Sequence, residues 1–579
     1  MTAELSAGAV SHTSTDWHSI PWKTVNETVR RLQARLVQAT KAGKWHKVQA
    51  LQHLLTHSCS GTSLAVRRVT ENQGQNTPGI DRVTWQDPES QWMAIHTLQQ
   101  LGYKALPLRR VSMPKAPGRQ RPLGLPTMKD RTMQAWYLHA LDPIADTTAD
   151  PNSYGLRKER RCADAMEPCA IGLSNSTRPQ WILEGDIKSC FDTISHDGLL
   201  THIPMDKTIL STWLKAGYMD KSALYATEDG TPQGGIISPV LANMALDGLE
   251  RILRKKYPHS GRRALQGKKK QGNLIRYADD FLITGLSKEV LEDDITPLVT
   301  DFLQERGRKL SEEKTSITPI EDGCDFLGPN VRQDKGHFLT RPSKKNVPAF
   351  LPRLRKVIKD NKQAPASWLI TQRNPTIRGW ANFHRHAAAK ETVVHVDTAI
   401  FKALWRWARR RHPKKGKRWV ADRDFGRLDK RSWRFFGTAK DHQGQTIHTW
   451  LCLASATPVT RCTQMKGDGN PYDPAWEIYR AERLGVQMEK TLRGRRTLLH
   501  LWKEHDGNCA VCTHPITQVT GWHNHHIVSK TMGGTDGTEN RVLIHPNCHR
   551  QVHATGLTVS KPRPVKAAPH AQPGALFHA

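Results

Sequence analysis

The sequence predicts a multidomain protein of the α+β class. At 579 residues the chain is too long for a single hydrophobic core, and its length indicates about three to five domains. Between about Val66 and Arg341, short β-rich runs alternate with helical patterns without regular βαβ spacing, which is typical of layered α+β domains. From Lys344 to about Arg411 the pattern is helical and strongly basic.

The composition points to a polyanionic partner. Lys and Arg number 86 and Asp and Glu 54, which gives a formal net charge of +32. Such an excess destabilises a compact chain by self-repulsion unless a polyanion offsets it, and nucleic acid does so because each neutralised phosphate releases a counterion. The sequence has no run of 18 apolar residues and no signal-peptide pattern, so we expect no membrane partner and a cytoplasmic, nucleoid-associated location.

The N-terminal 65 residues predict an amphipathic helix pair, since apolar residues from Val29 to Leu55 recur at helical spacing. We favour this ordinary packing role over a separate RNA-binding arm. Further along, Gly261–Lys270 is expected to be a solvated basic loop, and the tail after Ser560 is expected to be disordered because it is rich in Pro, Ala and Lys.

An acidic pair, Asp279 and Asp280, lies between two apolar runs in residues 274–283. Neighbouring residues of a strand point to opposite faces, so two carboxylates that share one site must lie at a turn. The pattern therefore predicts a hairpin of buried strands with the pair at its bend. A solvated turn is the ordinary alternative, but flanking buried strands would then leave carboxylates without partners at a cost of several kcal/mol.

A second acidic site ends an apolar strand at Asp186. Two divalent ions roughly 3.5–4 Å apart need about three carboxylates from different elements, and Asp186, Asp279 and Asp280 supply that number. Phe191 follows five residues after Asp186, where its ring could stand over the 2′ position of a sugar. We therefore expect a catalytic two-metal site that uses Mg²⁺.

The order of motifs resembles that of reverse transcriptases of bacterial and organellar group II introns. Pro114–Gly124 resembles the finger strands, Thr231–Gly235 the segment under the nucleotide, and Leu310–Thr315 and Phe326–Gly328 the last palm motifs. The resemblance implies right-hand-like fingers and palm, dNTPs as substrates, and substrate contacts from Lys115, Arg121, Phe191, Gln233 and Lys314.

Asn374–Phe383 resembles the signature of the helical thumb, or maturase, domain that binds intron RNA. Arg406, Arg409, Arg410 and Arg411 cluster on the same predicted helices. Charge runs on helices are usually solvated faces, but beside a polymerase palm phosphate binding is the better interpretation.

Two short knuckles near the C-terminus have the spacing of a structural zinc site. Their four predicted ligands are Cys509, Cys512, His545 and Cys548, and His545 departs from the second Cys pair that is more common in the family. The knuckles lie within about sixty residues, a size that can fold around its metal as a self-contained module.

The histidines around these knuckles resemble those of ββα-metal nucleases of the HNH class. The resemblance implies that His525, His549 and His553 bind one ion, that His526 is the general base, and that Asn540 holds the loop that carries it. The alternative is a structural zinc finger with bystander histidines, which would leave four histidines without a role.

The chain as a whole resembles a group II intron-encoded protein: a reverse transcriptase and maturase that binds intron RNA, with an endonuclease that nicks target DNA to prime cDNA synthesis. A splicing-only maturase and a free-standing defence reverse transcriptase are the alternatives. The segments expected are an N-terminal helical extension (1–65), fingers and palm (66–341), a helical thumb (342–428), a DNA-binding segment (429–490), an HNH domain (491–560) and a tail (561–579).

Overall fold

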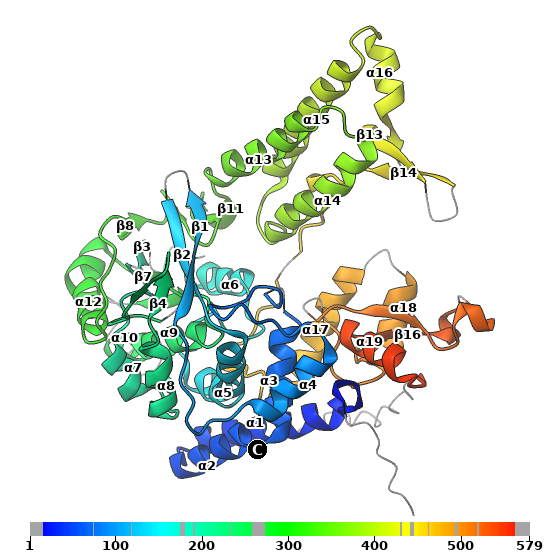
Figure 1. The fold of residues 1–579 in the computed structure, drawn as a ribbon. Helices are drawn as coiled ribbons and strands as arrows, with labels where there is room; N and C mark the ends of the chain where they lie inside the picture. The colour runs from blue at the N-terminus through cyan, green and yellow to red at the C-terminus, as the bar shows by residue number, and fades with distance from the viewer. Residues whose placement is uncertain are drawn as a thin grey trace, which may run out of the picture. The chain divides into compact units, whose positions relative to one another are not determined.

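A computed structural model describes residues 16–561, except for 73, 117–118, 174–179, 189–190, 232, 258–271, 429–430, 441–444, 461, 493–495, 518–519 and 536 (Figure 1). Its contacts divide the chain into two compact units. One comprises the described parts of Met1–Ala149, Ser189–Ala245 and Asp468–Ala579, and the other those of Asp150–Lys188 and Leu246–Gly467. The basic loop predicted at 261–270 and the tail after 561 lie outside the described residues.

The first unit begins with a helical layer. The predicted helix pair is present, and it is followed by two further helices and by α5, which is buried along most of its length. Val29, Leu36, Val48 and Leu55 are buried in this layer as the helical spacing indicated. The predicted domain boundary at residue 65 falls inside α3. The elements are η1 (Trp17–Ser19), α1 (Trp22–Lys41), α2 (Trp45–Thr56), α3 (Cys59–Thr70), α4 (Pro88–Thr97) and α5 (Met128–Thr148).

A four-stranded sheet of order β2-β1-β4-β5 belongs to the same unit. Strands β1 and β2 form a long antiparallel hairpin, and β1 pairs in parallel with β4. The elements are β1 (Leu108–Ala116), β2 (Arg119–Leu125), α7 (His196–His202), α8 (Lys207–Leu214), β4 (Tyr218–Asp220), β5 (Ala223–Tyr225) and α9 (Ser238–Leu246).

The second unit is built on an antiparallel sheet of order β6-β7-β3-β8. Its inner strand residues Ile182, Leu183, Leu282 and Ile283 are fully buried, as expected for apolar runs in a covered sheet. The elements are α6 (Cys162–Leu173), β3 (Trp181–Asp186), α10 (Leu249–Lys256), β6 (Asn273–Tyr277), β7 (Asp280–Gly285), η2 (Val290–Ile295), α12 (Thr296–Gln304), β8 (Ser316–Pro319), β9 (Cys324–Asp325), β10 (Pro329–Asp334) and β11 (His337–Pro342); the last three form a separate small sheet.

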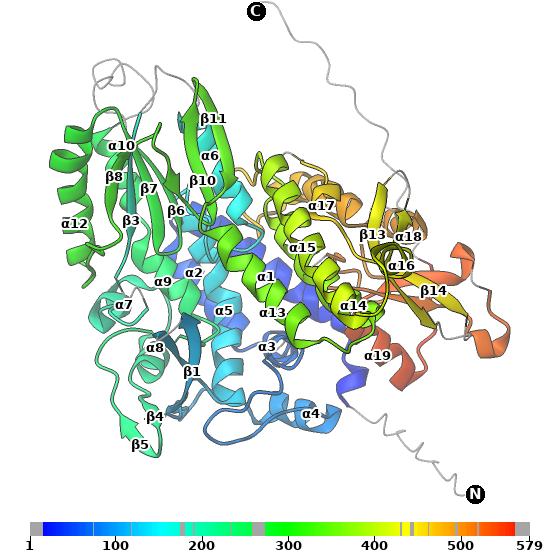
Figure 2. The same cartoon turned by 90° about the horizontal axis from the view of Figure 1, so that it is seen from above.

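Four helices and a three-stranded sheet of order β12-β13-β14 complete the second unit (Figures 1 and 2). Phe435 from the sheet and Leu451, directly after β14, share one buried core with Leu354, Ile377 and Leu404 from the helices. The predicted boundary at residue 428 therefore falls inside a sheet whose apolar side chains complete the helical core. The elements are α13 (Asn346–Asp360), α14 (Ala366–Phe383), α15 (Lys390–Arg411), α16 (Lys417–Asp424), β12 (Phe425–Leu428), β13 (Arg431–Lys440), β14 (Thr446–Trp450) and η3 (Ala454–Ala456).

The C-terminal part of the chain returns to the first unit, where a two-stranded antiparallel sheet and a helix form a ββα arrangement. In the part of the chain that the structure describes, no helix has the length and apolar character needed to span a membrane. The elements are η4 (Pro474–Trp476), α17 (Glu477–Leu492), α18 (Arg496–Glu504), β15 (His523–His526), η5 (Lys530–Met532), η6 (Thr538–Asn540), β16 (Arg541–Ile544) and α19 (Pro546–Thr555).

Candidate metal centres

The three acidic residues singled out from the sequence lie at one end of the β6-β7-β3-β8 sheet. Asp186 and Asp280 are directly paired across β3 and β7, and Asp279 lies in the turn that joins β6 to β7. Ala278 lies in this turn and has a positive φ of 58°. The backbone N–H of Ile187, directly after β3, donates to the carbonyl of Asp279 at 3.3 Å. The hairpin predicted from the sequence is thus present, with the acidic pair at its bend.

The electrostatics of this end favour a bound cation. Burial, together with the charges of Asp279 and Asp186, raises the pKa of Asp280 to about 7. Lys314 places its Nζ 2.5 Å from Oδ2 of Asp186, so one ammonium group already offsets part of the charge. Carboxylates that repel one another in a half-buried place are a donor set that suits Mg²⁺, which prefers oxygen ligands.

Close packing and a buried ion pair fix the strands that carry these carboxylates. Gly185 lies opposite Phe281, and a Cβ at Gly185 would approach the Phe281 ring to 2.3 Å, so only glycine fits there. Arg276, 1% exposed, donates to Asp247 at 2.5 Å and anchors β6. Burial raises the pKa of Asp247 to about 6 even though the charge of Arg276 opposes the rise.

The other predicted substrate contacts, apart from Lys314, lie in the first unit. Lys115 occupies the bulge of β1 between Pro114 and Ala116, and Arg121 is exposed on β2. The carbonyl of Gln233 accepts from Gly124 N–H at 2.9 Å, which ties this segment to the base of the β1–β2 hairpin.

Phe191 and Gln233 are held near one another by a short network. The Phe191 carbonyl accepts from the N–H of Thr231 at 2.7 Å, and the side-chain amide of Gln233 donates to Asp192 at 3.3 Å. The half-buried Phe191 ring packs against the core of this unit. The structure therefore brings the Phe191 and Gln233 segments together, while Lys314 lies with the carboxylates of the second unit.

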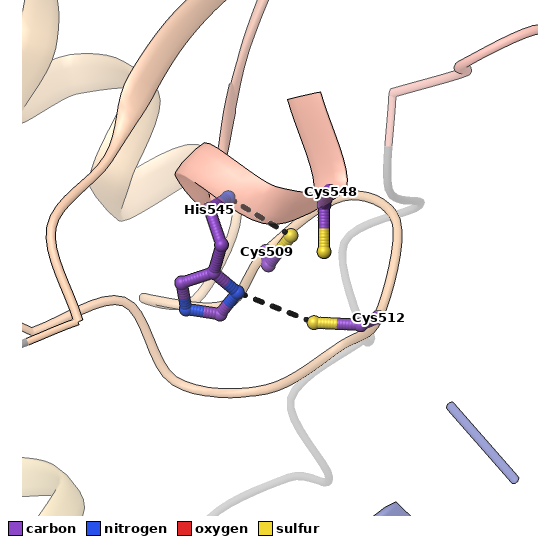
Figure 3. Close-up of side chains that lie close together, drawn as sticks. All are labelled: Cys509, Cys512, His545 and Cys548. Carbon is purple, nitrogen blue, oxygen red and sulfur yellow. Dashed lines mark hydrogen bonds between the residues drawn. The ribbon is translucent and has the colours of Figure 1, made fainter. Parts of the chain in front are cut away.

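The four predicted zinc ligands converge in a buried cluster (Figure 3). Their candidate ligand atoms all lie within 4.8 Å of one another. Cys509 and Cys512 come from one tight loop, whereas His545 caps α19 and Cys548 lies in its first turn. Three thiols and one imidazole in this arrangement are the donor set of a structural zinc site.

The orientation of His545 supports this assignment. Its Nδ1 lies 3.3 Å from the Sγ of Cys512, and its Nε2 lies 3.3 Å from the carbonyl oxygen of Pro515. An imidazole that donates one N–H to a carbonyl presents its other nitrogen as a ligand. Hydrogen bonds among the thiols lower the pKa of Cys509 and raise that of Cys548, so these sulfur atoms lie close enough to share one site.

The second predicted cluster, His525, His549 and His553, also comes together. His525 is buried on β15, and the Nε2 atoms of His549 and His553 lie 3.2 Å apart on successive turns of α19. Burial, and then the neighbouring histidines, lowers the pKa of His549 to about 4. The ring of His549 is therefore neutral at pH 7, which is the form that binds a metal.

His526 and Asn540, the other two residues predicted for the nuclease, lie on β15 and at the end of η6. His526 follows His525 on β15 and so points to the other face of the strand. The side chain of Asn540 accepts from Val528 N–H at 2.8 Å and donates to the carbonyls of Val528 and Thr535 at 2.9 Å. Asn540 thus fixes the loop that directly follows His526.

The sequence interpretation missed His523. This exposed residue lies two positions before His525, on the same face of β15, and its ring contacts the ring of His549 with centroids 4.9 Å apart. The alternation of a strand could have revealed it, because residues two apart share a face.

Four family models match the chain in the order of its domains. They describe the N-terminal domain of reverse transcriptase (residues 17–98), reverse transcriptase, an RNA-dependent DNA polymerase (113–331), the group II intron maturase-specific domain (347–425) and HNH endonuclease (509–555). The maturase match ends at residue 425, where β12 begins, so it stops short of the sheet that completes the helical core.

Curated relatives agree with these matches over about half of the chain. Protein YkfC of Escherichia coli is 29% identical over 54% of this chain and 90% of its own length. The group II intron-encoded protein LtrA of Lactococcus lactis is 27% identical over 54% of this chain and 64% of its own length, so less than two thirds of LtrA is spanned. A putative COX1/OXI3 intron 1 protein of Saccharomyces cerevisiae is 29% identical over 46% of this chain and 38% of its own length.

Among solved structures, telomerase from Candida albicans in complex with a fragment of telomeric RNA is similar over 55% of this chain and 64% of its own. The TM-score is 0.31 and the sequence identity is 11%. A likeness at this level does not decide the fold, which rests on the sheets and helices described above.

Proposed function

This chain belongs to the group II intron-encoded proteins, with reverse transcriptase, maturase and HNH endonuclease domains, and from that premise we propose roles for its two metal centres. The polymerase centre copies RNA into DNA, and the C-terminal centre nicks a strand of target DNA whose new 3′ end primes the copy. The family matches disfavour a free-standing polymerase, and three acidic residues at one end of the palm sheet disfavour a maturase that only binds RNA.

The observation that carries the polymerase proposal is the pairing of Asp186 with Asp280 beside Asp279. The three carboxylates would hold Mg²⁺, which would supply positive charge beside the attacking and leaving oxygens. The raised pKa of Asp280 supports a cation at this place, because a nearby positive charge would return the carboxyl to its ionised form.

We assign the triphosphate to Lys115 and Arg121, and the sugar and base of the dNTP to the neighbourhood of Phe191 and Gln233. The two cations lie on the β1–β2 hairpin, and the network through Gly124, Thr231 and Asp192 supports a fixed geometry for the other two. Lys314 is assigned to the charge balance of Asp186 and to the incoming phosphates.

In the nuclease we assign His526 as the general base that takes a proton from water, and Asn540 as the residue that positions it. His525, His549 and His553 would hold the ion of the reaction, which supplies a positive charge at the scissile phosphate. Cys509, Cys512, His545 and Cys548 would hold a structural Zn²⁺ that shapes the module.

The partners we propose are the intron RNA, bound as a ribonucleoprotein, the target DNA and dNTPs, in the compartment that holds the host DNA. A groove of about 640 Å³ between α13 and α15 supports RNA or DNA phosphate binding by the thumb. Trp407 lines this groove together with six cationic residues, which could bind phosphates: Arg355, Lys359, Lys362, Arg406, Arg410 and Arg411.

The polymerase assignment is tested by primer extension on poly(rA)/oligo(dT) with Mg²⁺. Asp279→Ala should lower extension at least about 100-fold, because it removes one ligand of ions that supply several kcal/mol. Asp322→Ala, at an exposed carboxylate in the same unit, is the matched control and should extend normally. Extension by Asp279→Ala within a few-fold of the unaltered chain would refute the assignment.

A further inference from the structure

Residues 17–22 pack against the C-terminal metal module, some 500 residues away in sequence. Trp17, Ile20 and Trp22 are buried in the same hydrophobic cluster as Cys509 and Cys548. Both views of the ribbon place α19 beside the N-terminal segment (Figures 1 and 2). The hydrophobic core of the metal module therefore includes side chains from the N-terminal segment.

Hydrogen bonds fix this contact. The Nε2 of Gln551, on α19, donates to the carbonyl of His18 at 2.6 Å and lies 3.4 Å from that of Ile20. Gln551 lies three residues after Cys548, so it belongs to the same helix that supplies the metal ligand. Trp17 meets Trp22 edge to face at 5.0 Å, which closes η1 over the start of α1.

Arg67, on α3, connects this contact to the cysteine cluster. It is 8% exposed, its guanidinium stacks on the ring of Trp22 at 4.6 Å, and its Nε donates to Glu71 at 3.0 Å. Burial lowers the pKa of Arg67, but the charges of Glu71, Cys548 and Cys512 outweigh it and raise the pKa. The buried guanidinium of Arg67 is thus held between Trp22 of the N-terminal segment and Glu71 of α3.

The metal-loaded cluster needs such a neighbour. Three thiolates and a neutral imidazole around Zn²⁺ leave one net negative charge, and all four ligands are buried. A buried charge is costly unless a counter-charge lies close by. Arg67 is a buried cation whose stacking on Trp22 also depends on the N-terminal segment.

We propose that Arg67 and residues Trp17–Trp22 are an integral part of the zinc module, with Arg67 as the counter-charge of the loaded cluster. Metal loading and docking of the N-terminal segment are then coupled, and the coupling is reciprocal. The nuclease module and the N-terminal domain of the polymerase consequently form one folding unit. This inference rests on the proposed zinc site and not on either catalytic activity.

The test uses the full chain and measures bound zinc by elemental analysis and release by a colorimetric chelator. Arg67→Gln should weaken zinc retention about 10- to 100-fold, as is typical for residues that surround a metal's ligands. Arg67→Lys keeps the positive charge and should therefore retain zinc better than Arg67→Gln does. Arg68→Gln, at the exposed neighbour, is the matched control and should release zinc as the unaltered chain does.

Hydrogen exchange supplies the converse measurement. Stripping zinc from the unaltered chain should increase exchange of the amides of residues 17–25, and Gln551→Ala should speed zinc release. If the unaltered chain binds no zinc, the zinc site and the inference both fall. If it binds zinc but Arg67→Gln retains it normally and residues 17–25 stay protected after stripping, the zinc site stands and the coupling is wrong.

Discussion

Lys314 places its ammonium group 2.5 Å from the carboxylate of Asp186, so a cation within one palm motif offsets the charge of the acid that ends β3. Asp186 ends β3, and Lys314 precedes β8, the strand that pairs with β3. The side chain of Asp186 is largely covered while that of Lys314 is 58% exposed, which leaves the lysine free to exchange partners.

Lys314→Ala is expected to lower primer extension about 10-fold and to raise the KM for dNTPs, because a charge-assisted hydrogen bond contributes about 1.5 kcal/mol. Lys309→Ala, at an exposed lysine in the same loop, should extend normally. Steady-state kinetics with varied dNTP measures both parameters. An unchanged KM and rate in Lys314→Ala would show that this lysine touches neither the carboxylates nor the substrate during catalysis.

Arg276→Met is expected to destabilise the palm by about 3–5 kcal/mol, because it leaves the buried carboxylate of Asp247 without its partner. The double variant Arg276→Met/Asp247→Leu should recover part of the loss, since neither member of the pair then leaves the other charge buried alone. Arg332→Met, which removes a half-exposed pair with Asp334, should cost no more than about 1 kcal/mol. Urea unfolding measures the three values, and a double variant worse than Arg276→Met would contradict this account.

Asn540→Ala is expected to reduce strand nicking at least about 10-fold and to leave zinc content and primer extension unchanged. The substitution removes three hydrogen bonds that hold residues 528–535, each worth about 1 kcal/mol, so the loop after His526 loosens. Thr538→Ala, in the same short helix η6, is the control. Loss of zinc in Asn540→Ala would mean that the residue supports the whole module rather than the catalytic loop.

Local patterns in the sequence predicted which residues form the acidic cluster and which form the two Cys/His clusters. The acidic pair between apolar runs gave the hairpin of β6 and β7, since strand alternation forces two carboxylates of one site into a turn. The knuckles and histidines predicted two clusters that the structure brings together. In each case the residues that form the pair or cluster are close in sequence or separated by a short loop, so a local pattern is enough to predict them.

Contacts between distant segments could not be predicted in this way. The zinc-held module was expected to stand alone, whereas Gln551 bonds to His18, and Trp22 shares a buried core with Cys548. Periodicity identifies Val66 and Val69 as a buried face of α3 but does not say what covers it. Likewise, the sequence placed Phe435 in a DNA-binding segment, whereas in the structure its side chain is buried with those of the thumb helices.

The most direct test of the central account is a paired assay on ribonucleoprotein reconstituted with the intron RNA that encodes the chain. Strand-specific nicking of a target duplex and primer extension are measured side by side for His526→Ala and Asp279→Ala. The two centres belong to different compact units, so His526→Ala should lose nicking and keep extension, and Asp279→Ala should do the reverse. Normal nicking by His526→Ala, or loss of both activities in either variant, would contradict the assignment of two independent metal centres.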